Sequence, residues 1–264
     1  MTQIFGILNV TADSFSDGGR YLDPAAAIAQ ARALADGGAD VIDIGAASSN
    51  PDAAAVGAEM EIARLSAVVP ALHEAGIALS VDSFEREVQV WALAQGVRWL
   101  NDIQGFPDAT LHPQLADSDA GLIVMHAVQG RGKAARIDVP PAEIMGRMFA
   151  FFDARVAALE QAGVARGRIV LDPGMGFFLG TDPETSLEAL RRTGALKARY
   201  GLPVLISVSR KSFIRAIAGR SAQEAGAATL AAELFAVSAG AAMIRTHDPR
   251  ALSDALKVTA ALRT

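Results

Sequence analysis

The sequence contains eight short apolar runs, about thirty residues apart, and each run ends at a polar or charged residue. Of all features of the sequence, this repeat most restricts the possible fold. The runs are continuously apolar, which is typical of strands that helices cover on both faces. A buried strand has no reason to end in a carboxylate, an amide or a base, so eight such ends indicate one site at one face. In chain order the polar ends include Asn9, Asp43, Asp82, Asn101, His126, Asp172, Lys211, Arg245 and His247.

The repeat predicts an α/β fold in which eight βα units close into a TIM barrel, a single domain over residues 1–264. An open doubly wound sheet is the alternative, but no GxGxxG follows the first strand. The expected strands are 3–9, 40–45, 77–82, 97–101, 120–125, 167–172, 203–207 and 242–246. The expected helices are 25–37, 58–75, 85–95, 109–117, 141–164, 184–199, 210–239 with a break near Gly219, and 248–262.

Composition and charge narrow the class of protein. The chain is 51% hydrophobic, and its net charge of −5 argues against a nucleic-acid partner. The absence of cysteine excludes disulfides, thiolate zinc sites and a cysteine nucleophile. The N-terminus lacks a signal-peptide pattern, and the most apolar stretch, Ala227–Ile244, contains Glu233. We therefore expect a cytoplasmic protein without a membrane span.

Three connections are longer than a barrel needs. The segments 11–24 and 46–57 are rich in Ser, Asp, Gly and Asn, and both would leave the C-terminal face, where barrel active sites lie. The stretch 127–140 is expected to be a surface excursion. The first two are candidate lids over a site.

Polar residues that end different strands would meet at the barrel mouth. Asp82, Asn101, Asp172 and Lys211 form a set suited to a flat heterocycle rich in N–H donors. Any one of them could instead cap a helix or solvate a strand end, but that alternative explains the whole set poorly.

A second set lies on the first and last strands, which are neighbours in a closed barrel. Arg245 and His247 beside Asn9 predict a phosphate or diphosphate pocket, in which the amide oxygen of Asn9 could complete a hydrated Mg²⁺ shell. Taken alone, His247 would be interpreted as a solvated loop histidine.

Two further segments suggest a second ligand. In DPGMGFF (172–178), Phe177 and Phe178 offer either an aromatic platform or core packing. Ser-Arg-Lys-Ser (209–212) opens a helix, whose N-terminus favours a carboxylate.

Along nearly its whole length the chain resembles dihydropteroate synthase. The matching segments are ILNVTADSFSDGG (7–19), GADVIDIG (38–45), SVDS (80–83), LNDIQGF (100–106), VMH (124–126), LDPGMGF (171–177), SVSRKS (207–212) and IRTHD (244–248). The resemblance implies a pterin-binding barrel that condenses 6-hydroxymethyl-7,8-dihydropterin diphosphate with p-aminobenzoate. The products would be 7,8-dihydropteroate and diphosphate, a step of folate biosynthesis. It also implies Mg²⁺ as cofactor and a homodimer, for which the apolar helices 221–239 and 248–262 leave room.

The resemblance also implies a role for individual residues. Pterin binding would fall on Asp82, Asn101, Asp172, Lys211 and Arg245, and diphosphate binding on Asn9, with Mg²⁺, Arg245 and His247. The aminobenzoate would contact Phe177, Pro51, Lys211 and Ser212. The catalytic residues would be Asp82, Asp172, Lys211 and Asp17, the last in the first lid loop.

The second loop departs from the family pattern GGESTRPG. Here it reads GAASSNPDA (45–53), with Ala47, Ser49 and Asn50 in place of Glu, Thr and Arg, and Phe178-Leu179 stands where a Lys is common. These changes resemble the sulfonamide-insensitive branch of the family, and loss of the loop cation predicts altered handling of aminobenzoate mimics. Two alternatives stay open, a methyltetrahydrofolate-dependent methyltransferase and a non-catalytic pterin-binding protein.

Overall fold

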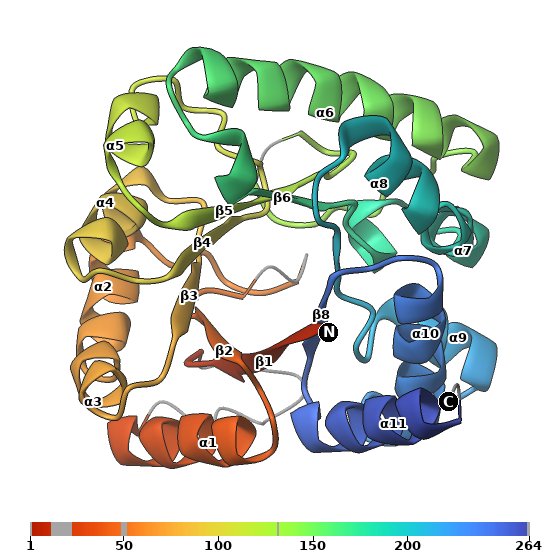
Figure 1. The fold of residues 1–264 in the computed structure, drawn as a ribbon, viewed down its shortest axis with the longest axis horizontal. Coiled ribbons are helices and arrows are strands. Elements are labelled where there is room, and N and C mark those ends of the chain that lie inside the picture. Colours follow the sequence, from red (N-terminus) through yellow and green to blue (C-terminus); the bar gives the residue numbers. More distant parts are fainter. Residues whose placement is uncertain (1, 12–22, 49–51, 131, 263–264) are drawn as a thin grey trace.

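Eight parallel strands form a barrel with the helices outside it (Figure 1). The computed structural model describes residues 2–11, 23–48, 52–130 and 132–262. The strands are β1 (Gln3–Asn9), β2 (Val41–Gly45), β3 (Leu79–Asp82), β4 (Trp99–Asp102), β5 (Gly121–Met125), β6 (Ile169–Asp172), β7 (Leu205–Ile206) and β8 (Met243–Thr246). Their order is β6-β5-β4-β3-β2-β1-β8-β7, and a bridge between Leu171 and Val204 joins the two edge strands. The predicted TIM barrel is confirmed.

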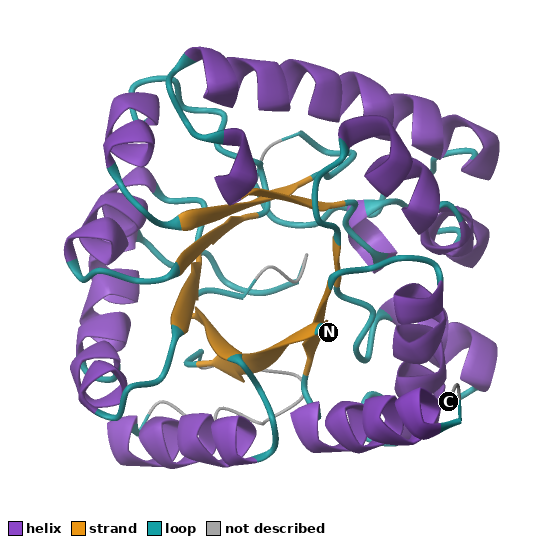
Figure 2. Ribbon diagram, in the orientation of Figure 1, coloured by secondary structure: helices purple, strands orange, loops and turns teal. Residues whose placement is uncertain are grey.

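A ring of helices covers the outside of the barrel (Figure 2). They are α1 (Pro24–Asp36), α2 (Ala58–Ser66), α3 (Val69–Glu74), α4 (Arg86–Ala94), α5 (His112–Asp117), α6 (Ile144–Gln161), α7 (Pro183–Arg191), α8 (Thr193–Tyr200), α9 (Ser212–Ala218), α10 (Gly226–Ser238) and α11 (Pro249–Ala261). None of these helices, as far as the structure describes the chain, is long and apolar enough to cross a membrane.

Two predicted helices are each divided in the structure. The predicted helix 58–75 is split into α2 and α3, because Pro70 lacks an amide hydrogen and therefore occupies a helix's first turn. The predicted helix 184–199 is interrupted at Arg192, whose φ of −97° and ψ of 13° end α7. The break expected near Gly219 is confirmed, since this residue caps α9 with a φ of 62°.

An apolar plug of side chains fills the barrel near the amino ends of the strands. Its members include Phe5, Val41, Val170 and Met243, and the ring of Phe5 packs edge-on against Trp99 with centroids 5.8 Å apart. Side chains alternate along a strand, so the residue two positions after each plug residue also points inward, one layer higher. That rule places in the upper layer Ile7, Asp43, Asn101, Asp172 and Arg245.

A carboxyl group is buried outside the barrel, and it makes stability depend on pH. Glu233 of α10 is 1% exposed, and burial raises its pKa to about 8. Because the folded-state pKa lies above the unfolded value, the folded state holds the proton more tightly, and this contribution to stability is lost as pH rises through about 8.

We expect the free energy of unfolding to fall by about 1 kcal/mol between about pH 7 and pH 9 on account of Glu233. Denaturant titrations at several pH values would measure this slope. Glu233→Gln should flatten it, and an equal slope in the variant would show that other groups cause the dependence.

Candidate active site

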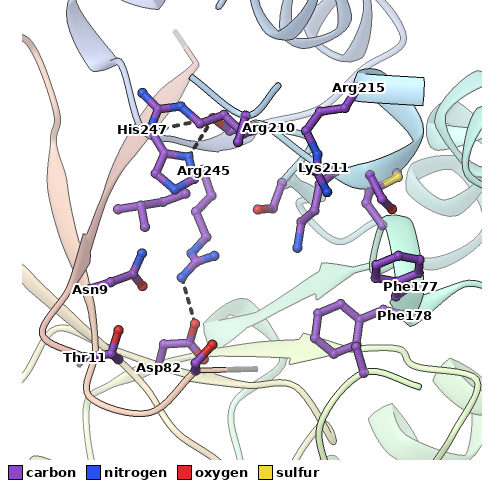
Figure 3. Close-up of a pocket in the computed structure, with 18 of the residues that line it drawn as sticks. Asn9, Thr11, Asp82, Phe177, Phe178, Arg210, Lys211, Arg215, Arg245 and His247 are labelled. Carbon is purple, nitrogen blue, oxygen red and sulfur yellow. Dashed lines mark hydrogen bonds and ion pairs between the residues drawn. The ribbon is translucent and has the colours of Figure 1, made fainter. Parts of the chain in front are cut away.

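A pocket of about 400 Å³ opens at the carboxyl ends of the strands (Figure 3). That volume suits a small-molecule site. Seven of the predicted site residues line it, namely Asn9, Asp82, Phe177, Lys211, Ser212, Arg245 and His247. Phe177 and Phe178 lie across the cavity from Asn9 and His247 (Figure 3). Asp17, Ser49, Asn50 and Pro51 lie outside the described residues.

Arg245 of β8 is the central cation of the site. Its Nε donates to Oδ2 of Asp43 on β2, and its Nη2 donates to Oδ2 of Asp82 on β3 at 2.7 Å. Burial alone would lower the pKa of Arg245, but the two carboxylates outweigh it and raise the pKa, so the guanidinium stays charged. Asp43, for which the resemblance implied no role, is completely buried and holds this cation in place.

Asp82 and Asp172 are carboxyl groups with raised pKa values. Burial raises the pKa of Asp82 to about 7, although Arg245 and Lys211 oppose the shift. Burial likewise raises the pKa of Asp172 to about 6, and the amide of Gly174 opposes it by donating to Oδ1 at 2.8 Å. Buried carboxyls with raised pKa values are typical of functional sites.

Asn101 and Asp172 lie deeper than the pocket lining, and only 3% and 2% of their surfaces are exposed. Nδ2 of Asn101 donates to Oδ2 of Asp43 at 3.4 Å. Oδ1 of Asn101 and Oδ1 of Asp43 are buried and accept no hydrogen bond from any described residue. Leaving a buried acceptor unpaired costs about 1–3 kcal/mol, so these two oxygens are suited to the N–H donors of a bound ligand.

Lys211 enters the pocket from the turn that precedes α9. Arg210, with a φ of 58°, holds a left-handed conformation that is uncommon for a residue with a side chain. Nζ of Lys211 lies 5.1 Å from the centre of the Phe178 ring, and burial lowers the pKa of Lys211 to about 8. Phe177 and Phe178 both line the pocket and pack in one apolar cluster, with Phe178 5% exposed and Phe177 partly buried.

His247 is held by Ser209 at the end of the pocket near Asn9. The Oγ of Ser209 accepts from the backbone amide of His247 at 3.2 Å and lies 2.9 Å from its Nδ1. Burial, assisted by Arg210 and Arg245, lowers the pKa of His247 well below its usual value. At neutral pH the ring therefore offers a hydrogen bond and no charge.

His126 is a polar strand end that lies outside the pocket lining and bonds to none of the other site residues named above. It is 3% exposed, its Nδ1 lies 3.2 Å from the carbonyl oxygen of Pro173, and its ring packs edge-on against Phe151. Burial lowers its pKa to about 4, so the ring is neutral. His126 supports the turn after Asp172, and the expectation that every polar end faces the site was wrong here.

Two pocket residues outside the predicted set come from the loops. Arg136 and Asp52 both line the pocket and bond to each other, and they come from the β5–α6 and β2–α2 connections. Irregular segments carry no periodic signal, so the sequence offered only a candidate lid at 46–57, which contains Asp52, and a surface excursion at 127–140, which contains Arg136.

Comparisons with known proteins agree with this geometry. The sequence profile of the family described as "Pterin binding enzyme" matches residues 5–247. The chain is 61% identical over 260 residues to "Dihydropteroate synthase type-2" of Escherichia coli, covering 98% of this chain and 96% of that protein. It is 52% identical over 262 residues to "Dihydropteroate synthase type-3" of Escherichia coli, with coverages of 99% and 100%.

A solved structure extends the similarity to three dimensions. The dihydropteroate synthase of Xanthomonas albilineans with 4-aminobenzoic acid has a TM-score of 0.88 and 35% sequence identity, covering 100% of this chain and 93% of that one. The chain therefore belongs to the pterin binding enzyme family and, within it, to the dihydropteroate synthases.

Proposed function

We propose that this protein joins 6-hydroxymethyl-7,8-dihydropterin diphosphate to p-aminobenzoate, giving 7,8-dihydropteroate and diphosphate. The observation that carries the proposal is the pair of unpaired buried oxygens of Asp43 and Asn101 beneath a cationic pocket. A pterin edge is rich in N–H donors and would satisfy such acceptors, while the cations above suit a diphosphate. The alkyl transfer also agrees with the family to which the chain belongs.

The proposed reaction needs no protein nucleophile. The bond between the pterin methylene and the diphosphate oxygen breaks, and the electron pair leaves with the diphosphate, which Arg245 and His247 stabilise as donors. Asp82 and Asp172 stabilise the positive charge that develops on the methylene and the dihydropterin ring. The amine of p-aminobenzoate then forms the new C–N bond and releases a proton to water.

His247 would act in this step as a neutral donor. The hydroxyl of Ser209 accepts from the amide of His247, so its own proton is free to bond to Nδ1. The ring proton then lies on Nε2, which can donate to a diphosphate oxygen.

We propose Mg²⁺ as the cofactor, with Asn9 as its protein ligand. No group of three or more acidic or histidine side chains suited to a metal occurs in the part of the chain that the structure describes. Mg²⁺ usually keeps several waters and relies on substrate phosphates, so a single amide oxygen at the pocket wall fits this ion. When bound, Mg²⁺ would neutralise charge on the leaving diphosphate.

The function is tested by measuring diphosphate release from the pterin substrate with and without p-aminobenzoate. We expect release to require p-aminobenzoate and to match dihydropteroate formation, and we expect EDTA to abolish it until Mg²⁺ is restored. Pterin binding without condensation would support a non-catalytic pterin-binding protein instead, and activity that persists in EDTA would remove Mg²⁺ from the proposal.

We also propose that sulfonamides inhibit this protein weakly. The support is the altered second loop, in which Asn50 replaces a cation, together with Phe178-Leu179 in place of the usual Lys. Sulfonamide added to the same assay would test this. Inhibition at the potency typical of family members would contradict the proposal.

We also propose that the protein is cytoplasmic and forms a homodimer, and exposed apolar side chains on α10 and α11 support the homodimer. Phe235 of α10 is 45% exposed, and Val258 and Leu262 at the end of α11 are 60% and 83% exposed. Contact with a second copy would remove these side chains from water. Light scattering of the purified protein should give twice the chain mass, and Phe235→Glu should shift the mass toward the monomer.

A further inference from the structure

The β5–α6 connection is tied to the β2–α2 loop at the edge of the pocket. The guanidinium of Arg136 donates two hydrogen bonds to the carboxylate of Asp52, from Nη1 to Oδ1 at 3.0 Å and from Nη2 to Oδ2 at 2.5 Å. Nζ of Lys133 donates to the carbonyl oxygen of Ala53. Two loops that are far apart in the sequence therefore meet over the site.

Arg136 also lies against the predicted aromatic platform. Its Cζ is 5.5 Å from the centre of the Phe177 ring, and both residues line the same pocket. Ser212 lines this pocket too, and its Oγ lies 3.2 Å from the place where a Cβ on Gly176, the residue before Phe177, would be. Ser212 and Arg136 thus line the same pocket as the residue that an aromatic substrate ring would contact.

The bond between Arg136 and Asp52 is easily exchanged. The two side chains are 52% and 57% exposed, and pairs of this kind contribute about 0–1 kcal/mol to stability. Another carboxylate of the same shape could replace Asp52 in the fork without loss of bonding. The central cation of the site, Arg245, already pairs with Asp43 and Asp82, and the proposed reaction uses it as a donor to the diphosphate.

We propose that Arg136 binds the carboxylate of p-aminobenzoate and exchanges Asp52 for the substrate. Arg136 would thereby select aromatic amines that carry an acid group and would supply the cation that the second loop lacks at Asn50. The inference rests on the proposed condensation, and it assigns Arg136 as a specificity-determining residue. A substrate ring against Phe177 would present its acid group to the guanidinium, in the pocket that Ser212 also lines.

If Asp52 competes with the substrate for Arg136, substitutions of Asp52 and of Arg136 should have different effects on the binding of p-aminobenzoate. Removing the cation should weaken binding of p-aminobenzoate, whereas removing the competing carboxylate with Asp52→Asn should strengthen it or leave it unchanged. If Arg136 only anchored the loop, both substitutions would break the same bond and would weaken binding alike.

The test compares wild type, Arg136→Gln, Asp52→Asn and a matched control with two amines, p-aminobenzoate and its neutral amide, p-aminobenzamide. The control is Arg191→Gln, which breaks an equally exposed ion pair with Glu184 on α7, away from the pocket. We expect Arg136→Gln to raise KM for p-aminobenzoate about tenfold, with little change in kcat or in KM for the pterin diphosphate. KM for the amide should not change, and the control should resemble wild type.

Three results would overturn the role of Arg136. They are an unchanged KM for p-aminobenzoate in Arg136→Gln, an equal rise for the acid and the amide, and an equal rise in Asp52→Asn. Because wild-type condensation is measured in the same experiment, an active wild type with any of these results rejects the specificity role alone. An inactive wild type would instead reject the proposed function.

Discussion

Replacing Arg245 with methionine should lower kcat/KM for the condensation by at least about 1000-fold and should also destabilise the fold. The side chain neutralises two carboxylates, of which Asp43 is completely buried and Asp82 is 20% exposed. Removing one partner of a buried ion pair leaves an uncompensated charge, which costs about 3–5 kcal/mol. The variant would also lose a donor to the leaving diphosphate, a type of contact worth about 100-fold to 1000-fold in rate.

The two effects of Arg245→Met are separated by a second substitution. Steady-state kinetics and denaturant unfolding should be measured for the single variant and for the double variant with Asp43→Asn. We expect the double variant to recover much of the stability, because the buried charge is gone, but none of the activity. A single variant with wild-type stability would show that water reaches Asp43, and recovered activity would place Arg245 outside the chemistry.

Asp172→Asn should lower kcat by about 100-fold while leaving the fold intact. The amide oxygen of asparagine can still accept from the amide of Gly174, so the turn after β6 is preserved. What is lost is the negative charge that stabilises the cationic methylene, and groups of this kind contribute about 100-fold to 1000-fold. Single-turnover kinetics would report the chemical step directly.

The pH profile gives an independent check on the same carboxylates. Because the pKa of Asp172 is raised to about 6 and that of Asp82 to about 7, both lose their charge as pH falls through this range. The rate of the wild-type protein should therefore fall as the pH drops below about 7. In Asp172→Asn, the part of this fall that occurs near pH 6 should be absent. Nearly full kcat in the variant would contradict charge stabilisation by Asp172.

Part of the site could be predicted from the sequence, because the carboxyl ends of the strands of a parallel barrel meet at one face. Asp82, Asn101 and Asp172 were predicted at the mouth because each closes an apolar run. Asp82 lines the pocket there, whereas Asn101 and Asp172 lie deeper in the barrel. A sequence pattern cannot show which inward-facing residues bond to one another across the barrel. The hydrogen bond from Arg245 to Asp43 was therefore found only in the structure.

Loops and helix breaks were harder to predict. Arg136 lies in an irregular segment, and its approach to Asp52 and Phe177 depends on how two loops pack. The interruption at Arg192 has no proline or glycine at that position to signal it. Tertiary packing decides such features, and a local pattern carries little information about them.

The closure of the barrel between β6 and β7 has a consequence for ligand binding. β7 has two residues and meets β6 through one bridge, so this is where the wall has the fewest backbone hydrogen bonds. Asp172 ends one of these strands, and Lys211 follows the other. A pterin bound by both Asp172 and Lys211 would bridge β6 and β7. The bound substrate would therefore strengthen the barrel wall where the two strands share the fewest hydrogen bonds.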